Sequence, residues 1–167
     1  MLLASTTSIA ADGLVLRVLH AGDAQAVVEA TLECDDAVWV PQHPPYAVAE
    51  AREFLAEYDR RRERGEAVSF GVFGSDSEML LAGLVVQQAA PGDVELAYWV
   101  RPDYRGRGIA ARSLDALSDW VESRLGPHRL WVEVARSNQA SLRTAANAGY
   151  RPSGMKGGKV VLVRTRP

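Results

Sequence analysis

A turn rich in glycine and arginine joins a predicted strand to a predicted helix, and it constrains the fold more than any other segment. The strand is expected over Val94–Val100, whose residues are apolar, aromatic and β-branched. The helix is expected after the turn, where apolar residues recur every three or four positions: Ala110, Leu114, Leu117, Val121 and Leu125. Glycines let a backbone approach a ligand closely, and a helix N-terminus offers unpaired N–H groups and a positive dipole end. This turn therefore predicts a site for a pyrophosphate.

A glycine-rich turn taken alone is more often only structural, so the order of strand, turn and helix carries the argument. Two other phosphate-binding motifs do not fit. The chain has no Gly-Lys-Ser/Thr sequence to form a Walker A loop. The run Arg105-Gly106-Arg107-Gly108 also lacks the three-glycine pattern of dinucleotide-binding folds.

Composition narrows the class of protein. The chain has 167 residues, of which 47% are hydrophobic and 24% charged, as expected of one globular domain. The net charge of −2 gives no reason to expect nucleic-acid binding. No apolar run is long enough to cross a membrane, and the N-terminus lacks the positive region of a signal peptide, so a cytoplasmic location is expected. Cys34 is the only cysteine, and the histidines lack metal-ligand spacing, so no metal is expected.

The hydrophobic pattern predicts one α/β domain over residues 1–167, with a frayed start at 1–12. Turn residues and helix caps separate the elements. Strands are expected at Leu14–Leu19, Ala67–Phe73, Leu80–Gln88, Val94–Val100, Arg129–Val134 and Lys159–Val163. Helices are expected at Asp23–Leu32, Ala47–Arg64, from about Ala110 to Leu125, and from Gln139 or Ala140 to Ala148.

Two motifs resemble the GNAT N-acetyltransferase superfamily. The spacing Arg105-x-x-Gly108-x-Ala110 is similar to its acetyl-CoA signature, and Asn138-x-x-Ser141 followed by Gly149-Tyr150 is similar to its Asn-x-x-Ser…Gly-Phe pattern. The segments Trp39-Val40-Pro41 and 95–100 resemble the RimJ/RimL-like branch, which acetylates protein N-terminal amines. The resemblance implies a GNAT fold. Its central sheet would be mixed, mostly antiparallel and splayed near the middle, with about four flanking helices.

The resemblance also implies where acetyl-CoA would bind. Backbone N–H groups of the turn would hold the pyrophosphate, namely those of Arg105, Gly106, Arg107, Gly108, Ile109 and Ala110. The pantetheine arm would lie along Tyr98, Trp99 and Val100, with Asn138 and Ser141 near the thiol. Each of the last two also has a plain structural interpretation, Asn138 as a helix cap and Ser141 as a solvent-facing serine.

The chemistry of transfer favours a weakly basic acceptor. Deprotonating a lysine with a pKa of ~10.4 costs roughly 4–5 kcal/mol at pH 7, whereas an α-amine near ~8 costs about 1–1.5. Glu95, close to the family's catalytic-glutamate position, is the candidate general base through water, or else a solvent-facing strand residue. Many relatives carry a tyrosine acid where this chain has Ala145, so Ser141 is expected to hydrogen-bond the thiolate instead. Trp39 and Tyr98 are candidate substrate contacts, though either could equally be a core residue.

The leading hypothesis is an acetyl-CoA-dependent N-acetyltransferase that transfers acetyl directly to a primary amine in a ternary complex. The acceptor could be a protein N-terminus or a small-molecule amine, and the protein could be a monomer or a homodimer. The absence of the tyrosine acid leaves open a non-catalytic acyl-CoA-binding or sensing domain. A third hypothesis is a phosphate- or RNA-binding module that uses Arg105, Arg107 and the Arg60–Arg64 cluster. The acidic balance and the lack of interleaved exposed aromatic residues disfavour it.

Overall fold

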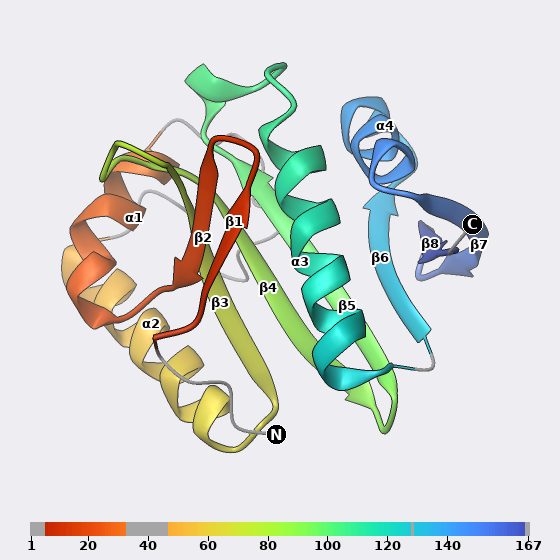
Figure 1. Cartoon of the computed structure of the whole chain (residues 1–167), viewed down its shortest axis with the longest axis horizontal. Coiled ribbons are helices and arrows are strands. Elements are labelled where there is room, and N and C mark those ends of the chain that lie inside the picture. Colours follow the sequence, from red (N-terminus) through yellow and green to blue (C-terminus); the bar gives the residue numbers. More distant parts are fainter. Residues whose placement is uncertain (1–5, 33–46, 128, 166–167) are drawn as a thin grey trace.

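The computed structural model describes residues 6–32, 47–127 and 129–165. They form one eight-stranded sheet in the order β1-β2-β3-β4-β5-β6-β8-β7 (Figure 1). The strands are β1 (Ser8–Ala11), β2 (Leu14–Val18), β3 (Ala67–Gly74), β4 (Leu80–Ala90), β5 (Asp93–Val100), β6 (Arg129–Ala135), β7 (Tyr150–Lys156) and β8 (Lys159–Arg164). The helices are α1 (Ala24–Thr31), α2 (Val48–Glu63), α3 (Ile109–Leu125) and α4 (Gln139–Asn147), with short 3₁₀ turns η1 (Ala21–Asp23) and η2 (Pro102–Tyr104).

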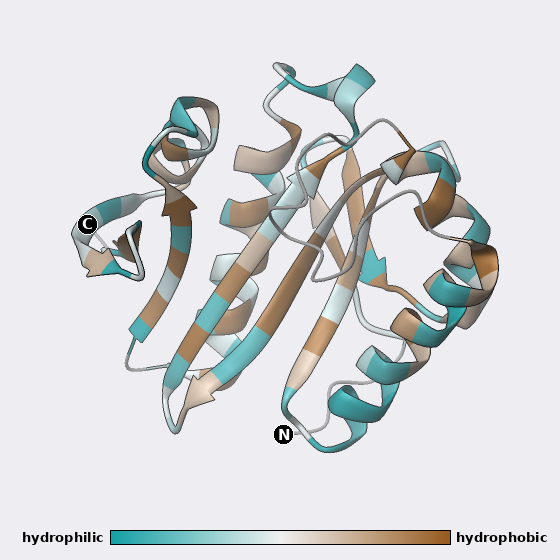
Figure 2. Ribbon diagram, turned by 180° about the vertical axis from the view of Figure 1, so that it is seen from behind, coloured by the Kyte–Doolittle hydropathy of each residue, from teal (hydrophilic) through white to brown (hydrophobic). Residues whose placement is uncertain are grey.

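The helices cover the sheet on both sides and create two cores. One core fills the space between the sheet and α3, where Leu114, Leu117 and Val121 are fully buried. The other lies under α1 and α2, where Leu55 packs with Trp99. Seen from behind in Figure 2, α1 and α2 stand to the side of β5 and β6. None of the helices in the described ranges is long and apolar enough to cross a membrane.

The sheet opens between β5 and β6. Every ladder is antiparallel except this one, which is parallel and pairs Asp93–Leu96 with Arg129–Val132. The pairing ends there, so the strands separate from Ala97 and Glu133 onward. The expected mixed, mostly antiparallel sheet, splayed near its middle and flanked by four helices, is thus confirmed.

Two strands lie where the sequence predicted none. Residues 8–11, expected to be frayed, pair with β2 through a tight turn in which Asp12 and Gly13 both have positive φ. Ile9 and Ala11 are the buried residues of this short strand, too few for a clear alternating pattern. β7 is an edge strand whose pairing is interrupted between Pro152 and Gly154. Proline and glycine ordinarily argue against a strand, and only an edge or a bulge tolerates them.

Candidate active site

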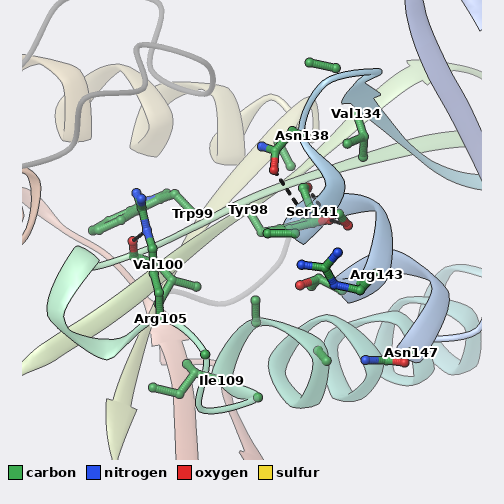
Figure 3. A pocket seen from close by; sticks show the side chains of 18 of the residues that line it. Tyr98, Trp99, Val100, Arg105, Ile109, Val134, Asn138, Ser141, Arg143 and Asn147 are labelled. Atoms are coloured by element: carbon green, nitrogen blue, oxygen red, sulfur yellow. Dashed lines mark hydrogen bonds between the residues drawn. The ribbon is translucent and has the colours of Figure 1, made fainter.

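A cavity of about 520 Å³ lies where the sheet opens (Figure 3). Its walls come from both diverging strands, from the turn before α3, and from α4. The lining residues are Ala97, Tyr98, Trp99, Val100, Tyr104, Arg105, Gly106, Gly108, Ile109, Ala110, Ala111, Glu133, Val134, Ala135, Asn138, Ala140, Ser141, Arg143, Thr144, Asn147 and Lys159. A cavity of this size can hold an extended ligand. The described residues contain no cluster of three metal-ligating side chains.

The turn at the start of α3 has the geometry of an anion site. Gly106 and Gly108 have φ of 75° and 70°, a left-handed conformation that favours glycine. Gly108 is the N-cap residue, and no side chain within the described part of the chain caps this end of the helix. The first N–H groups of α3 are therefore available to a ligand, and the helix dipole favours an anion there.

Arginines hold this turn through its own carbonyl groups. Arg105 Nε donates to Val100 O at 3.2 Å, and an Arg107 guanidinium nitrogen donates to Asp103 O at 3.2 Å. Arg112 donates to the carbonyls of Gly108 and Arg107 on one side and to Asp12 O on the other. The sequence analysis missed Arg112, because nothing along the chain links it to a turn one hundred residues earlier.

Tyr98, Asn138 and Ser141 form a hydrogen-bonded group at the cavity wall. Asn138 Oδ1 accepts from the Ser141 N–H at 3.0 Å and so caps α4. The Tyr98 hydroxyl donates to Ser141 O at 2.8 Å and shares a hydrogen bond with Ser141 Oγ at 2.7 Å. Burial raises the pKa of Tyr98 to about 12, so its hydroxyl stays protonated at neutral pH. Tyr98 is both a core residue and a partner of the serine.

The other predicted site residues are placed as follows. Trp99 and Val100 line the cavity, but the Trp99 ring is only 7% exposed and packs in the core under α1 and α2. Arg107 does not line the cavity; its guanidinium stacks over the Tyr104 ring, 4.7 Å from the centroid. Trp39 lies outside the described residues. Most of the predicted cofactor residues are thus brought to one cavity.

Glu95 lies below the opening rather than in it. It is still paired across the ladder with Trp131, and it does not line the cavity. Its carboxylate accepts a hydrogen bond from Gln87 Nε2 at 2.9 Å. A base at this position would have to act through water, as the sequence analysis expects.

Glu133 is a second carboxylate, which the sequence analysis missed. It is the first residue of β6 beyond the paired segment, and it lines the cavity. Its side chain is 17% exposed and lies 2.8 Å from Lys156 Nζ and 3.9 Å from Lys159 Nζ. No motif marks Glu133 in the sequence, because its place at the opening depends on where the pairing with β5 ends.

The comparisons agree with this geometry. Residues 13–151 match the model of the acetyltransferase (GNAT) domain. A curated relative, "Probable N-acetyltransferase YjcK" of Bacillus subtilis (strain 168), is 26% identical over 113 residues, which are 66% of this chain and 62% of that protein.

Solved structures extend the likeness to nearly the whole fold. The ribosomal-protein-S5-alanine acetyltransferase of Vibrio fischeri superposes with a TM-score of 0.81 at 15% identity, covering 95% of this chain and 96% of that one. RimJ of Mycobacterium smegmatis, in complex with a CoA disulfide, gives 0.79 at 18% identity, covering 94% and 85%. RimL, a ribosomal L7/L12 α-N-protein acetyltransferase in complex with coenzyme A, gives 0.80 at 20% identity, covering 95% and 97%. The chain belongs to the GNAT acetyltransferase family.

Proposed function

We propose that this protein is an acetyl-CoA-dependent N-acetyltransferase whose acceptor is a primary amine, foremost the N-terminal α-amine of a protein or peptide. One observation carries the proposal: a single cavity runs from an uncapped helix N-terminus to the gap between β5 and β6. Such a cavity offers an anion site at one end and an amine site at the other. The RimL and RimJ structures with coenzyme A or its disulfide support this use of the fold.

Acetyl-CoA would supply the acyl group as a thioester, and this chain's residues fit its two ends. The N–H groups from Gly106 to Ala110 would bind the pyrophosphate, whereas the Arg105 N–H, also expected to do so, already donates to Pro102 O at 3.2 Å. Arg143 adds a cation on the opposite wall (Figure 3). Asn138 and Ser141 would stand at the thiol end. The Ser141 hydroxyl can turn from Tyr98 to the departing sulfur, while the protonated Tyr98 hydroxyl keeps its hydrogen bond to Ser141 O.

Glu133 and Glu95 would have different roles toward the acceptor amine. Glu133, on the cavity wall, would bind the incoming ammonium. Glu95, two residues before the opening, would accept the amine proton through a water molecule. The neutral amine then attacks the thioester carbonyl and the C–N bond forms. The C–S bond breaks, the nitrogen loses its second proton to the departing sulfur, and coenzyme A leaves as the thiol. No covalent acetyl-enzyme is needed for this direct transfer.

An N-terminal amine is preferred over a lysine on energetic grounds. An α-amine near pKa ~8 costs about 1–1.5 kcal/mol to deprotonate at pH 7, against roughly 4–5 for a lysine. Small-molecule amines of similar basicity are the second acceptor class. We place the activity in the cytoplasm and in one domain spanning residues 1–167, with no metal, nucleic-acid or membrane partner.

Calorimetric titration with acetyl-CoA, with adenosine diphosphate as the comparison, tests the proposal. We expect micromolar binding of acetyl-CoA that is much tighter than that of the diphosphate, and thiol release when an amine peptide is added. Gly108→Glu should abolish binding, because a carboxylate would stand where the pyrophosphate belongs. Normal binding by that variant would mean that the site is misplaced. Tight binding with no thiol release against a broad amine panel would identify a non-catalytic acyl-CoA sensor.

A further inference from the structure

The only two lysines of the chain are Lys156 and Lys159, and both lie on the Glu133 carboxylate. All its other basic side chains, histidine apart, are arginines. The two lysines flank the Gly157-Gly158 turn that joins β7 to β8. Lys156 Nζ lies 2.8 Å from Glu133 and 4.6 Å from the centre of the Trp131 ring, while Lys159 lines the cavity. One carboxylate thus holds two ammonium groups at the place where the acceptor amine must arrive.

The other carboxylates near this place already have cationic links of their own. Asp93 lies 3.6 Å from Arg129 and accepts from the indole N–H of Trp131. Glu95 accepts from Gln87, whose side-chain oxygen in turn accepts from Arg61 at 3.4 Å. Among the described residues of this region, Glu133 is therefore the carboxylate that two lysines share, and the second lysine is a cation in excess of the carboxylates. Among the groups named here, four cations (Arg61, Arg129, Lys156 and Lys159) stand against three carboxylates (Asp93, Glu95 and Glu133).

This excess positive charge disfavours the binding of an acceptor whose only charged group is its ammonium. An α-ammonium that binds Glu133 competes with Lys156 and Lys159 for the carboxylate, and it adds a further positive charge beside them. An acceptor that also carries a carboxylate close to its amine leaves the balance unchanged, because the displaced lysine gains a partner. Both lysine side chains are exposed enough to move, at 62% and 46%.

We infer that Lys156 and Lys159 make the site selective for peptide N-termini with an acidic residue next to the terminal amine. In the bound state the α-ammonium lies on Glu133, and the acidic side chain of the acceptor lies on Lys156 and Lys159. This inference rests on the proposed function and names its acceptor class. The lysines act as specificity-determining residues and take no part in the bond changes.

Peptides that differ only at their second residue test the inference. Aspartate, asparagine and lysine are compared in the same heptapeptide, and kcat/KM is measured by thiol release from acetyl-CoA. We expect the aspartate peptide to exceed the asparagine peptide by about fivefold, the effect of a pair of partly exposed charges, and the lysine peptide to be poorest. Raising the salt concentration to ~0.5 M should reduce the preference, because exposed charges are screened.

Variants separate selectivity from folding. The double variant Lys156→Met/Lys159→Met should bring the aspartate-to-asparagine ratio close to one, and the corresponding double arginine variant should restore it. Arg151→Met removes a cation from the same strand without contact with Glu133, and it should keep the wild-type ratio. A ratio near one in the wild type, or an unchanged ratio in the double methionine variant, overturns the inference. Wild-type protein that transfers acetyl to no peptide or small amine would instead overturn the proposed function.

Discussion

At the residue scale, the roles of Glu95 and Glu133 differ in what their removal should change. Glu133 lines the cavity and Glu95 does not. Glu133→Gln should raise the acceptor KM by about tenfold with a smaller effect on kcat, because a charge-assisted contact with the ammonium is lost. Glu95→Gln should lower kcat by about 100-fold, because the amine proton loses its acceptor. Steady-state kinetics from pH 6 to 9 measure both.

The opposite pattern would reassign the base. A kcat lowered about 100-fold in Glu133→Gln, together with full activity in Glu95→Gln, would mean that the carboxylate at the cavity removes the proton directly. Gln87→Ala serves as the control, because it removes the hydrogen-bond donor of Glu95 and leaves both carboxylates in place.

Sequence motifs predicted four residues that the structure places at the cavity. Gly106, Gly108, Asn138 and Ser141 could be found because their spacing reflects local backbone geometry, a turn and a helix cap. Glu133 could not be found in this way. Its importance depends on where the pairing of two strands ends, and that point is set by packing across the sheet.

At the scale of elements, one glycine on β4 leaves the space that a tryptophan of β5 occupies. Gly83 lies directly across the ladder from Trp99, and a Cβ at position 83 would overlap the indole nitrogen. Gly83→Ala should therefore lower the free energy of unfolding by about 1–3 kcal/mol, the usual range for overpacking a core. Because Trp99 is on the strand that borders the cavity, the variant should also bind acetyl-CoA more weakly.

Urea unfolding and calorimetry measure the two effects of Gly83→Ala. Gly154→Ala on the edge strand β7 is the matched control, since a Cβ there would meet nothing within 4 Å. Equal stability of the two variants would mean that Trp99 can move aside without cost.

The strands that the sequence missed show what local patterns lack. β1 consists of four residues and is defined by its pairing with β2, which a single-strand pattern cannot reveal. β7 contains Pro152 and Gly154, and its residues other than Tyr150 are exposed, so no alternation marks it. Longer elements such as α3 were found because each buries a complete apolar face.

At the scale of the whole molecule, the opening between β5 and β6 divides the sheet into two parts. An ion-pair cluster between Arg164 of β8 and three carboxylates of α3, here called the clamp, helps to join them. Only four residue pairs connect β5 to β6. Beyond them, Arg164 of β8 reaches α3, where it lies 2.8 Å from Asp115 and 2.7 Å from Asp119. Glu122 is a third carboxylate, at 4.0 Å. The Arg164 side chain is only 9% exposed, whereas its partners Asp115 and Asp119 are 54% and 69% exposed.

Arg164→Met should lower the free energy of unfolding by about 1–2 kcal/mol, because it removes two ion pairs with exposed carboxylates, each worth up to about 1 kcal/mol. It should also weaken acetyl-CoA binding several-fold, since the cavity lies between the two parts of the sheet that the clamp holds together. Arg124→Met, which removes an exposed cation from the last turn of the same helix, should cost less than about 1 kcal/mol. Urea unfolding gives the first quantity and calorimetry the second. Lost stability with unchanged affinity would mean that β5, β6 and α4 set the width of the cavity without the clamp; loss of both would make the clamp part of the binding site's framework.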